Sequence, residues 1–206
     1  MPKTLPNGLV VYTTQDWGAK PPEHAFAPTT PDDVILHHMD WPNRAPITAG
    51  TSAQINAAFD VARRCQQDHM VSNGWADTGQ HFTVTIDGIV LEGRHGSLDA
   101  LLAGHCIRGA HAADSGVSPP VDDNNSWGTE HEGTFITATM NLQQWTASVM
   151  LQAAITLFCQ LDTATIKGHR DTGCSTACPG DWFESQIPRF REETHTAKLK
   201  LLAAHR

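Results

Sequence analysis

The sequence lacks several features that mark whole classes of protein. It has a single Tyr, and no apolar run approaches the roughly 18 residues that a membrane-spanning helix needs. The first six residues contain no apolar core of a signal peptide, and no block of five like charges occurs anywhere. We therefore expect no membrane association, no signal peptide in this sequence and no charged tail.

Basic residues are also scarce. Lys and Arg total 14 against 22 Asp and Glu, which gives a formal net charge of −8. A nucleic-acid-binding domain normally carries a basic patch or stripe, so this class of partner is excluded. His, by contrast, is abundant at 12 residues. Because neutral imidazole is a frequent metal ligand, this composition directs the search to metal sites.

The cysteines exclude two further classes. There are five, and no two are spaced as C-x-x-C, so neither a zinc ribbon nor a thioredoxin motif is present. An odd number leaves at least one thiol unpaired, and the pairing of Cys65, Cys106, Cys159 and Cys174 remains open. Cys65 and Cys159 fall on apolar helical faces, which is typical of small buried side chains.

The hydrophobic pattern predicts one domain of alternating strands and helices. The expected strands lie at 34–36, at 127–135 and near 166, and a hairpin at 81–92 turns at Asp87-Gly88. One helix is expected from Thr51 or Ser52 to a stop at 72–74, and a second at 143–161. A third helix is expected from 181 to 206, with an interruption near Pro188. This order predicts an α/β fold with a mixed central β-sheet flanked by helices.

The predicted domain has three parts. Residues 1–33 are rich in Pro and are expected to form an irregular N-terminal segment. Residues 34–190 would form the main domain, and 191–206 a C-terminal helix packed on it or extending it. No internal repeat or linker divides the chain into two domains.

His169 and Cys178 are the strongest local sign of chemistry. They lie nine residues apart on one predicted loop and can reach a common point, where imidazole and thiolate suit zinc. His37 or His38, at the end of the first buried strand, could supply a third ligand. The two point to opposite faces of a strand, so only one joins readily. Three protein ligands leave a fourth position for water, the arrangement of a catalytic zinc.

Eight short motifs occur in order between about residues 16 and 190. They are Asp16–Pro22, Ile35–His38, Gly74–Phe82, Asp87-Gly88, Glu92–Arg94, Gly109–Ala112, Gly168–Asp171 and Ala177–Gly180. Together they resemble the zinc-dependent N-acetylmuramoyl-L-alanine amidases of type 2, a family that includes peptidoglycan recognition proteins and phage endolysins. The resemblance implies a single domain with a mixed sheet, one catalytic zinc ion, and hydrolysis of the amide between N-acetylmuramic acid and L-Ala of peptidoglycan.

The resemblance also implies roles for individual residues. Its zinc ligands would be His37, His169 and Cys178, with His38 left out of the ligand set. His111 would line the substrate groove, and Arg94 is a candidate contact to the stem peptide.

The implied proton-transfer group departs from the common family pattern. Many members carry a catalytic Tyr where this chain has Gln80, and an amide cannot act as a base near neutral pH. However, residues 126–133 resemble the S-I-G-I-E-L-E-G segment of bacterial cytoplasmic anhydro-muropeptide amidases, whose first Glu is the catalytic base. That position is Glu130, with Glu132 as the alternative on the same strand face. Thr176 matches a position from which members contact the scissile carbonyl.

These observations predict an enzyme. We expect a monomeric, zinc-dependent peptidoglycan amidase, a bacteriolytic phage endolysin acting on the host cell wall, or a secreted, wall-associated enzyme if its signal segment was removed. Its partners would be peptidoglycan or muropeptides, with no nucleic acid and no membrane. One alternative is a non-catalytic peptidoglycan-recognition module, which often lacks the Cys found here at 178. The other is a cytoplasmic muropeptide-recycling amidase.

Overall fold

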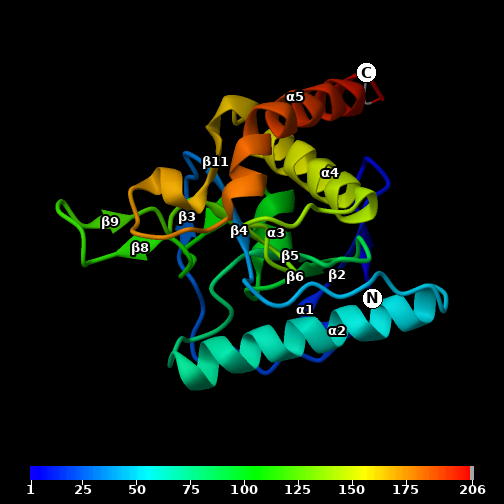
Figure 1. The fold of residues 1–206 in the computed structure, drawn as a ribbon, viewed down its shortest axis with the longest axis horizontal. Helices are drawn as coiled ribbons and strands as arrows, with labels where there is room; N and C mark the ends of the chain where they lie inside the picture. The colour runs from blue at the N-terminus through cyan, green and yellow to red at the C-terminus, as the bar shows by residue number, and fades with distance from the viewer. Residues whose placement is uncertain (205–206) are drawn as a thin grey trace.

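A seven-stranded mixed β-sheet forms the centre of the molecule, as the computed structural model, which describes residues 1–204, shows in Figure 1. Its strands, in spatial order, are β1 (Lys3–Thr4), β2 (Val10–Tyr12), β6 (Val90–Glu92), β5 (Phe82–Val84), β10 (Trp127–His131), β4 (Val34–His38) and β11 (Ile166–Gly168). This confirms the predicted α/β fold with a mixed central sheet in one domain.

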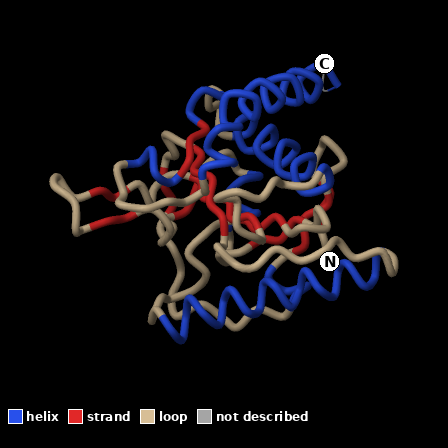
Figure 2. The backbone as a smooth tube through the Cα atoms, in the orientation of Figure 1, coloured by secondary structure: helices blue, strands red, loops and turns tan. Residues whose placement is uncertain are grey.

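Helices cover both faces of this sheet (Figure 2). The α-helices are α1 (Thr14–Trp17), α2 (Thr51–Gln67), α3 (Ser97–Leu102), α4 (Leu142–Phe158) and α5 (Asp181–Ala204). In Figure 1, α4 and α5 lie together on one side of the sheet and α2 on the other. None of the described helices is long and apolar enough to cross a lipid bilayer.

Short elements complete the chain. A π-helix (Asp68–Ser72) continues α2, and 3-10 turns occur at Thr163–Thr165 and His169–Thr172. Two small antiparallel pairs stand apart from the main sheet: β3 (Pro28–Thr29) with β7 (Cys106–Ile107), and β8 (Ala113–Asp114) with β9 (Val121–Asp122). The β8–β9 pair projects from the body of the molecule (Figure 1).

The centre of the sheet is parallel. β10 pairs in parallel with both β4 and β5, and β4 pairs in parallel with β11. The register sets Glu130 beside His37. Because parallel strands end at the same edge of a sheet, the residues that finish β4, β10 and β11 gather at one edge. His37, Glu130 and His169 are therefore brought to the same region of the molecule.

Two apolar clusters hold the helices to the sheet. The larger lies under α4 and α5 and contains fully buried side chains such as Leu36, Trp127 and Phe183. The smaller lies under α2 and contains Trp17 and Leu91. Burial of each such side chain stabilises the fold by about 1.5–3 kcal/mol, so the sheet edge is built on a rigid base.

Several local expectations are confirmed. The predicted hairpin is present as antiparallel β5 and β6, and the first buried strand and the two long helices lie where the periodicity indicated. The strand expected over 127–135 ends earlier, at His131, ahead of Gly133, whose φ of 111° does not fit a strand. All five cysteines lie within the described residues, and all are free thiols.

The N-terminal segment differs from its prediction. Most of residues 1–33 is irregular, but the segment also supplies the short elements β1, β2, α1 and β3. β2 pairs in parallel with β6, and the indole nitrogen of Trp17 donates to the carbonyl of Glu92 at 2.8 Å. These strands give no clear signal in the sequence, because each is only two or three residues long and Pro is frequent around them.

The C-terminal helix also differs from its prediction. α5 runs without a break from Asp181 to Ala204, with Pro188 inside it. The helix expected separately over 191–206 is therefore the second half of α5. Residues 205–206 lie outside the described part of the chain. Buried Phe183 and Ile187 precede Pro188, and buried Phe190 follows it. Packing of both halves against α4 outweighs the loss of one helical hydrogen bond at Pro.

His131 provides a test of the packing between β10, β4 and α4. Its Nδ1 lies 2.7 Å from the carbonyl oxygen of His37, and its Nε2 lies 2.7 Å from the hydroxyl of Ser148. Burial lowers the pKa of His131 to about 4. Between pH 6.5 and 4 the unfolded chain therefore binds a proton at this residue that the folded chain does not.

The expected result is a loss of stability in acid. As the pH falls from 6.5 to about 4, His131 alone removes up to about 3 kcal/mol from the free energy of unfolding. Urea unfolding of the metal-free protein across this range measures the slope. The matched variant His131→Gln, which cannot titrate, should show a shallower loss. Equal slopes for both proteins would contradict the assignment of a buried neutral imidazole.

Candidate functional site

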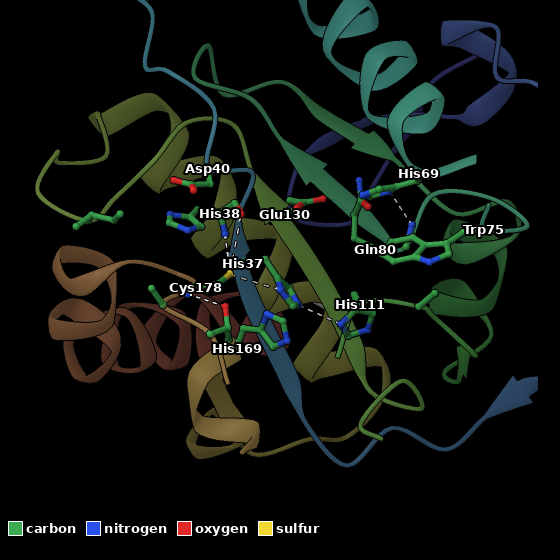
Figure 3. Close-up of a pocket in the computed structure, with 15 residues that line it drawn as sticks. His37, His38, Asp40, His69, Trp75, Gln80, His111, Glu130, His169 and Cys178 are labelled. Carbon is green, nitrogen blue, oxygen red and sulfur yellow. Dashed lines mark hydrogen bonds between the residues drawn. The ribbon is translucent and has the colours of Figure 1, made fainter. Parts of the chain in front are cut away.

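A cavity of about 360 Å³ opens at the carboxyl-terminal edge of the parallel strands (Figure 3). It is lined by His37, His38, Asp40, His69, Trp75, Gly79, Gln80, Ala110, His111, Glu130, Ile136, His169, Thr176, Ala177 and Cys178. Five of these side chains are imidazoles, and one is a thiol. Such a concentration of nitrogen and sulphur donors is typical of a metal centre.

His37, His169 and Cys178 converge in this cavity. Each offers a ligand atom, and the three atoms lie within 4.8 Å of one another. His37 stands on β4, His169 follows β11, and Cys178 precedes α5. The Nδ1 of His37 lies 3.7 Å from the Sγ of Cys178, close to the roughly 3.5 Å that separates N and S on a tetrahedral zinc ion.

The chemistry of these three groups fits zinc. The Nε2 of His169 is buried and has no hydrogen-bond partner among the described residues, as expected of a nitrogen that awaits a metal. The backbone N–H of His38 donates to the Sγ of Cys178 at 3.4 Å, a contact that stabilises a thiolate. Burial lowers the pKa of His37, as do His111 and its other imidazole neighbours, so this imidazole is neutral and able to ligate.

A line of hydrogen bonds selects the nitrogen that His37 presents. The carbonyl oxygen of Ser126 can only accept, so the Nε2 of His111, 3.1 Å away, carries the hydrogen. The Nδ1 of His111 is then an acceptor, and the Nε2 of His37 donates to it at 3.0 Å. This leaves the lone pair of His37 on Nδ1, the atom that faces Cys178.

Two glycines make room for this line. A Cβ atom at Gly109 or at Gly128 would lie 2.6 Å from the His111 ring, closer than packed atoms tolerate. The sequence implied only a substrate contact for His111. Its contact with His37 could not be foreseen, because it depends on the fold that brings residues 37, 111 and 126 together.

Glu130 lies beside His37 in the register of β10 and β4, and it lines the same cavity as the three candidate ligands. Burial raises the pKa of its carboxyl group to about 7. Glu132, the alternative base, does not line this cavity. Its carboxylate accepts from Arg44 at 2.7 Å and from the backbone N–H of Ile86 at 2.9 Å. Only the first of the two glutamates is therefore positioned to act in the cavity.

The remaining candidate residues divide between two locations. Thr176 lines the cavity, and its hydroxyl oxygen accepts from the N–H of Cys178 at 3.1 Å. Gln80 lines it as well. Arg94 does not: its guanidinium group stacks on Phe26 at 4.0 Å and borders a neighbouring cavity. The structure thus separates Arg94 from the candidate metal ligands.

Two aromatic side chains of the cavity wall, His69 and Trp75, were not among the residues that the sequence indicated. In the structure both line the cavity, with their rings 4.7 Å apart between centroids. The signal that could have found His69 is weak, because it depends on the change from α-helix to π-helix at Asp68.

The chain belongs to the N-acetylmuramoyl-L-alanine amidase family, whose family model matches residues 27–181. Peptidoglycan-recognition protein SC2 of Drosophila melanogaster is 29% identical over 186 residues, which cover 87% of this chain and 85% of that protein. The solved structure of Drosophila PGRP-LB is 27% identical, with a TM-score of 0.66 over 86% of this chain and 91% of that one. The amidase LysC from Clostridium intestinale, at 20% identity, shares the fold with a TM-score of 0.61 and coverage of 87% and 95%.

Loss of a candidate ligand should remove the metal. We expect Cys178→Ala and His169→Ala each to abolish zinc binding at the His37–His169–Cys178 site, because two protein ligands rarely hold zinc tightly. Elemental analysis after exchange into buffer with limiting zinc measures this. The exposed His195→Ala is the control and should bind as the unaltered protein does. Retention of one zinc ion with the affinity of the unaltered protein in both ligand variants would refute the ligand set.

Loss of the hydrogen bond behind His37 should weaken the metal without removing a ligand. His111→Phe fills the same space but has no acceptor for the Nε2 hydrogen of His37. We expect zinc affinity to fall about 10–100-fold. Competition against a chromophoric chelator gives the affinity. An unchanged affinity would mean that His37 does not depend on His111 for its orientation.

Proposed function

We propose that this member of the amidase family is a catalyst, a zinc-dependent hydrolase of the amide between N-acetylmuramic acid and L-Ala in peptidoglycan. The observation that carries the proposal is that a carboxyl group with a raised pKa, Glu130, shares one cavity with the complete set of three candidate ligands. Binding alone requires neither a metal ligand set with an open position nor an adjacent base.

The metal centre and Glu130 divide the work of hydrolysis. Zinc held by His37, His169 and Cys178 would supply Lewis acidity to the scissile carbonyl and lower the pKa of water. Glu130 takes a proton from the attacking water and delivers it to the departing amide nitrogen, as a C–O bond forms and the C–N bond breaks. Burial, which raises the pKa of Glu130 to about 7 in the metal-free cavity, favours a group that must both accept and release a proton.

Thr176 assists at the carbonyl oxygen. Because its hydroxyl oxygen already accepts from the N–H of Cys178, its own hydrogen remains to donate into the cavity. Such a donor stabilises the negative charge that develops on the carbonyl oxygen during attack. The hydroxyl carries no charge, so its contribution is smaller than that of the metal.

The base is assigned to Glu130 because the cavity contains no phenol. The single Tyr of the sequence, Tyr12, lies on β2 and does not line the cavity. Gln80 cannot exchange a proton near neutral pH. Within this cavity Glu130 is therefore the group best suited to the role that many family members give to Tyr.

A second candidate function is peptidoglycan recognition without hydrolysis. It is favoured by the names of the curated relatives, which are peptidoglycan-recognition proteins.

Under the catalytic proposal the substrate is intact peptidoglycan, cleaved as a bacteriolytic endolysin cleaves the host wall. A recycling amidase would instead prefer small soluble anhydro-muropeptides.

Mass spectrometry of digested peptidoglycan separates these functions. The catalytic proposal predicts stem peptides with a free L-Ala amino terminus, lost on zinc chelation and restored by added zinc. Binding to the wall with no released peptide would favour recognition. Release only from soluble anhydro-muropeptides would favour recycling and contradict the endolysin assignment.

Replacement of Glu130 tests the base. Glu130→Gln keeps the shape of the side chain, so zinc content and fold should persist while kcat falls about 10²–10⁴-fold. The exposed Glu192→Gln serves as the control. Activity close to that of the unaltered protein in Glu130→Gln would reassign the base.

The pH profile tests the same group independently. A base acts deprotonated, so kcat/KM should fall as the pH drops through the pKa of Glu130. Burial raises this pKa from 4.5 to about 7 in the metal-free cavity, and bound zinc lowers it, so the acidic limb should lie between these values. The residual activity of Glu130→Gln should lack this limb. An identical limb in the variant would assign the titration to another group.

A further inference from the structure

A second group of metal-binding atoms lies in the same cavity. Cys65 on α2, His69 on the π-helix and Glu130 on β10 each offer a ligand atom, and these atoms lie within 4.8 Å of one another. The Sγ of Cys65 is 3.7 Å from the Nδ1 of His69 and 3.8 Å from the Oε2 of Glu130. The first of these distances equals the one between His37 and Cys178 in the first ligand set.

We propose that Cys65, His69 and Glu130 form a second, inhibitory zinc site. A thiolate, an imidazole and a carboxylate are the three ligand types that zinc takes in proteins. Zinc at this site engages the carboxylate of Glu130, which then can no longer accept a proton from water. The inhibitory effect rests on the proposed function, whereas the binding of the second ion does not.

The nitrogen of His69 that faces Cys65 is the one that carries the lone pair. The backbone N–H of Gly79 donates to Nδ1 at 3.0 Å, so this nitrogen carries the lone pair and Nε2 carries the hydrogen. The ring also packs against Trp75. A metal bond to Nδ1 therefore replaces one hydrogen bond and needs no change of tautomer.

Gln80 is a second, independent sign of a ligand at this place. Its Nε2 donates to the Sγ of Cys65 at 3.2 Å and to the hydroxyl of Thr83 at 3.0 Å. The first of these bonds would stabilise a thiolate bound to metal. Its Oε1 is buried without a hydrogen-bond partner among the described residues, although the side chain lines the cavity. A buried oxygen without a partner, on a side chain that also contacts Cys65, is the kind of polar group that a bound ion or its water would satisfy.

The second site can be reached from the cavity. His69 and Glu130 line it, whereas Cys65 lies behind them with 3% of its surface exposed. In Figure 3, Glu130 lies between the His37–His169–Cys178 group and the side of the cavity formed by His69 and Gln80. Glu130 is thus placed to serve catalysis in one state and to hold a metal in another.

Cobalt(II) titration tests the site without reference to activity. In Cys178→Ala the first site is disrupted, so a remaining thiolate-to-cobalt absorption band with one equivalent of metal is assigned to Cys65. We expect this band to be lost in Cys178→Ala/Cys65→Ala. Absence of the band in the single variant, or its persistence in the double variant, would overturn the site. If Cys65→Ala does not fold, His69→Gln in the Cys178→Ala background should weaken cobalt binding at least tenfold, and unchanged binding would be equally decisive.

Inhibition of the unaltered enzyme by zinc tests the inhibitory role of the second site. Amidase activity, normalised to each protein's own maximum, should rise with the first equivalent of free zinc and fall at higher concentrations. Cys65→Ala should need at least tenfold more zinc for the same fall. Equal inhibition curves, or cobalt binding with no inhibition by zinc, would overturn the inhibitory role. A protein without amidase activity would contradict the proposed function instead, and the cobalt titration would still decide the site.

Discussion

The parallel pairing of β10 with β4 is the constraint on which the rest of the site depends. Its register sets Glu130 beside His37, so a carboxyl group and a metal-binding imidazole are held next to each other by backbone hydrogen bonds. β11 pairs with the other side of β4 and delivers His169 to the same edge. A shift of one residue in either strand would turn these side chains to the opposite face. Helices α4 and α5 hold this register by packing their apolar faces on the sheet.

Hydrogen bonds then orient the side chains that the strands bring together. The line from the carbonyl of Ser126 through His111 leaves the lone pair of His37 on the nitrogen that faces Cys178. Burial lowers the pKa of His37, so that this imidazole is neutral, and raises the pKa of Glu130, so that this carboxyl group binds a proton more readily than usual. The ligand atoms of Cys65 and His69 lie close to that of Glu130, on its other side. The cavity therefore borders two sets of candidate metal ligands, and Glu130 belongs to the second while it lies beside His37 of the first. In the proposal above, the concentration of free zinc decides which role Glu130 performs.

The predictable features were those encoded by short sequence spacing. The β5–β6 hairpin follows from alternation around Asp87-Gly88, and the convergence of His169 with Cys178 follows from their separation on one loop. Features that depend on contacts between distant segments were missed. The strands of residues 1–33 are too short to give a periodic signal, and α5 continues through Pro188 because α4 packs on both halves. The cluster of Cys65, His69 and Glu130 joins residues of α2 and the π-helix to a residue of β10, a contact that no local pattern reveals.

The central claim is that His37, His169 and Cys178 hold a single zinc ion while Glu130 stays unbound beside it. X-ray absorption at the zinc edge of the protein loaded with one equivalent of zinc measures this directly. We expect one sulphur ligand at about 2.3 Å and two imidazole nitrogens at about 2.0–2.1 Å, with the sulphur signal retained in Cys65→Ala and lost in Cys178→Ala/Cys65→Ala. A shell without sulphur, or one whose sulphur persists in Cys178→Ala/Cys65→Ala, would contradict this ligand set.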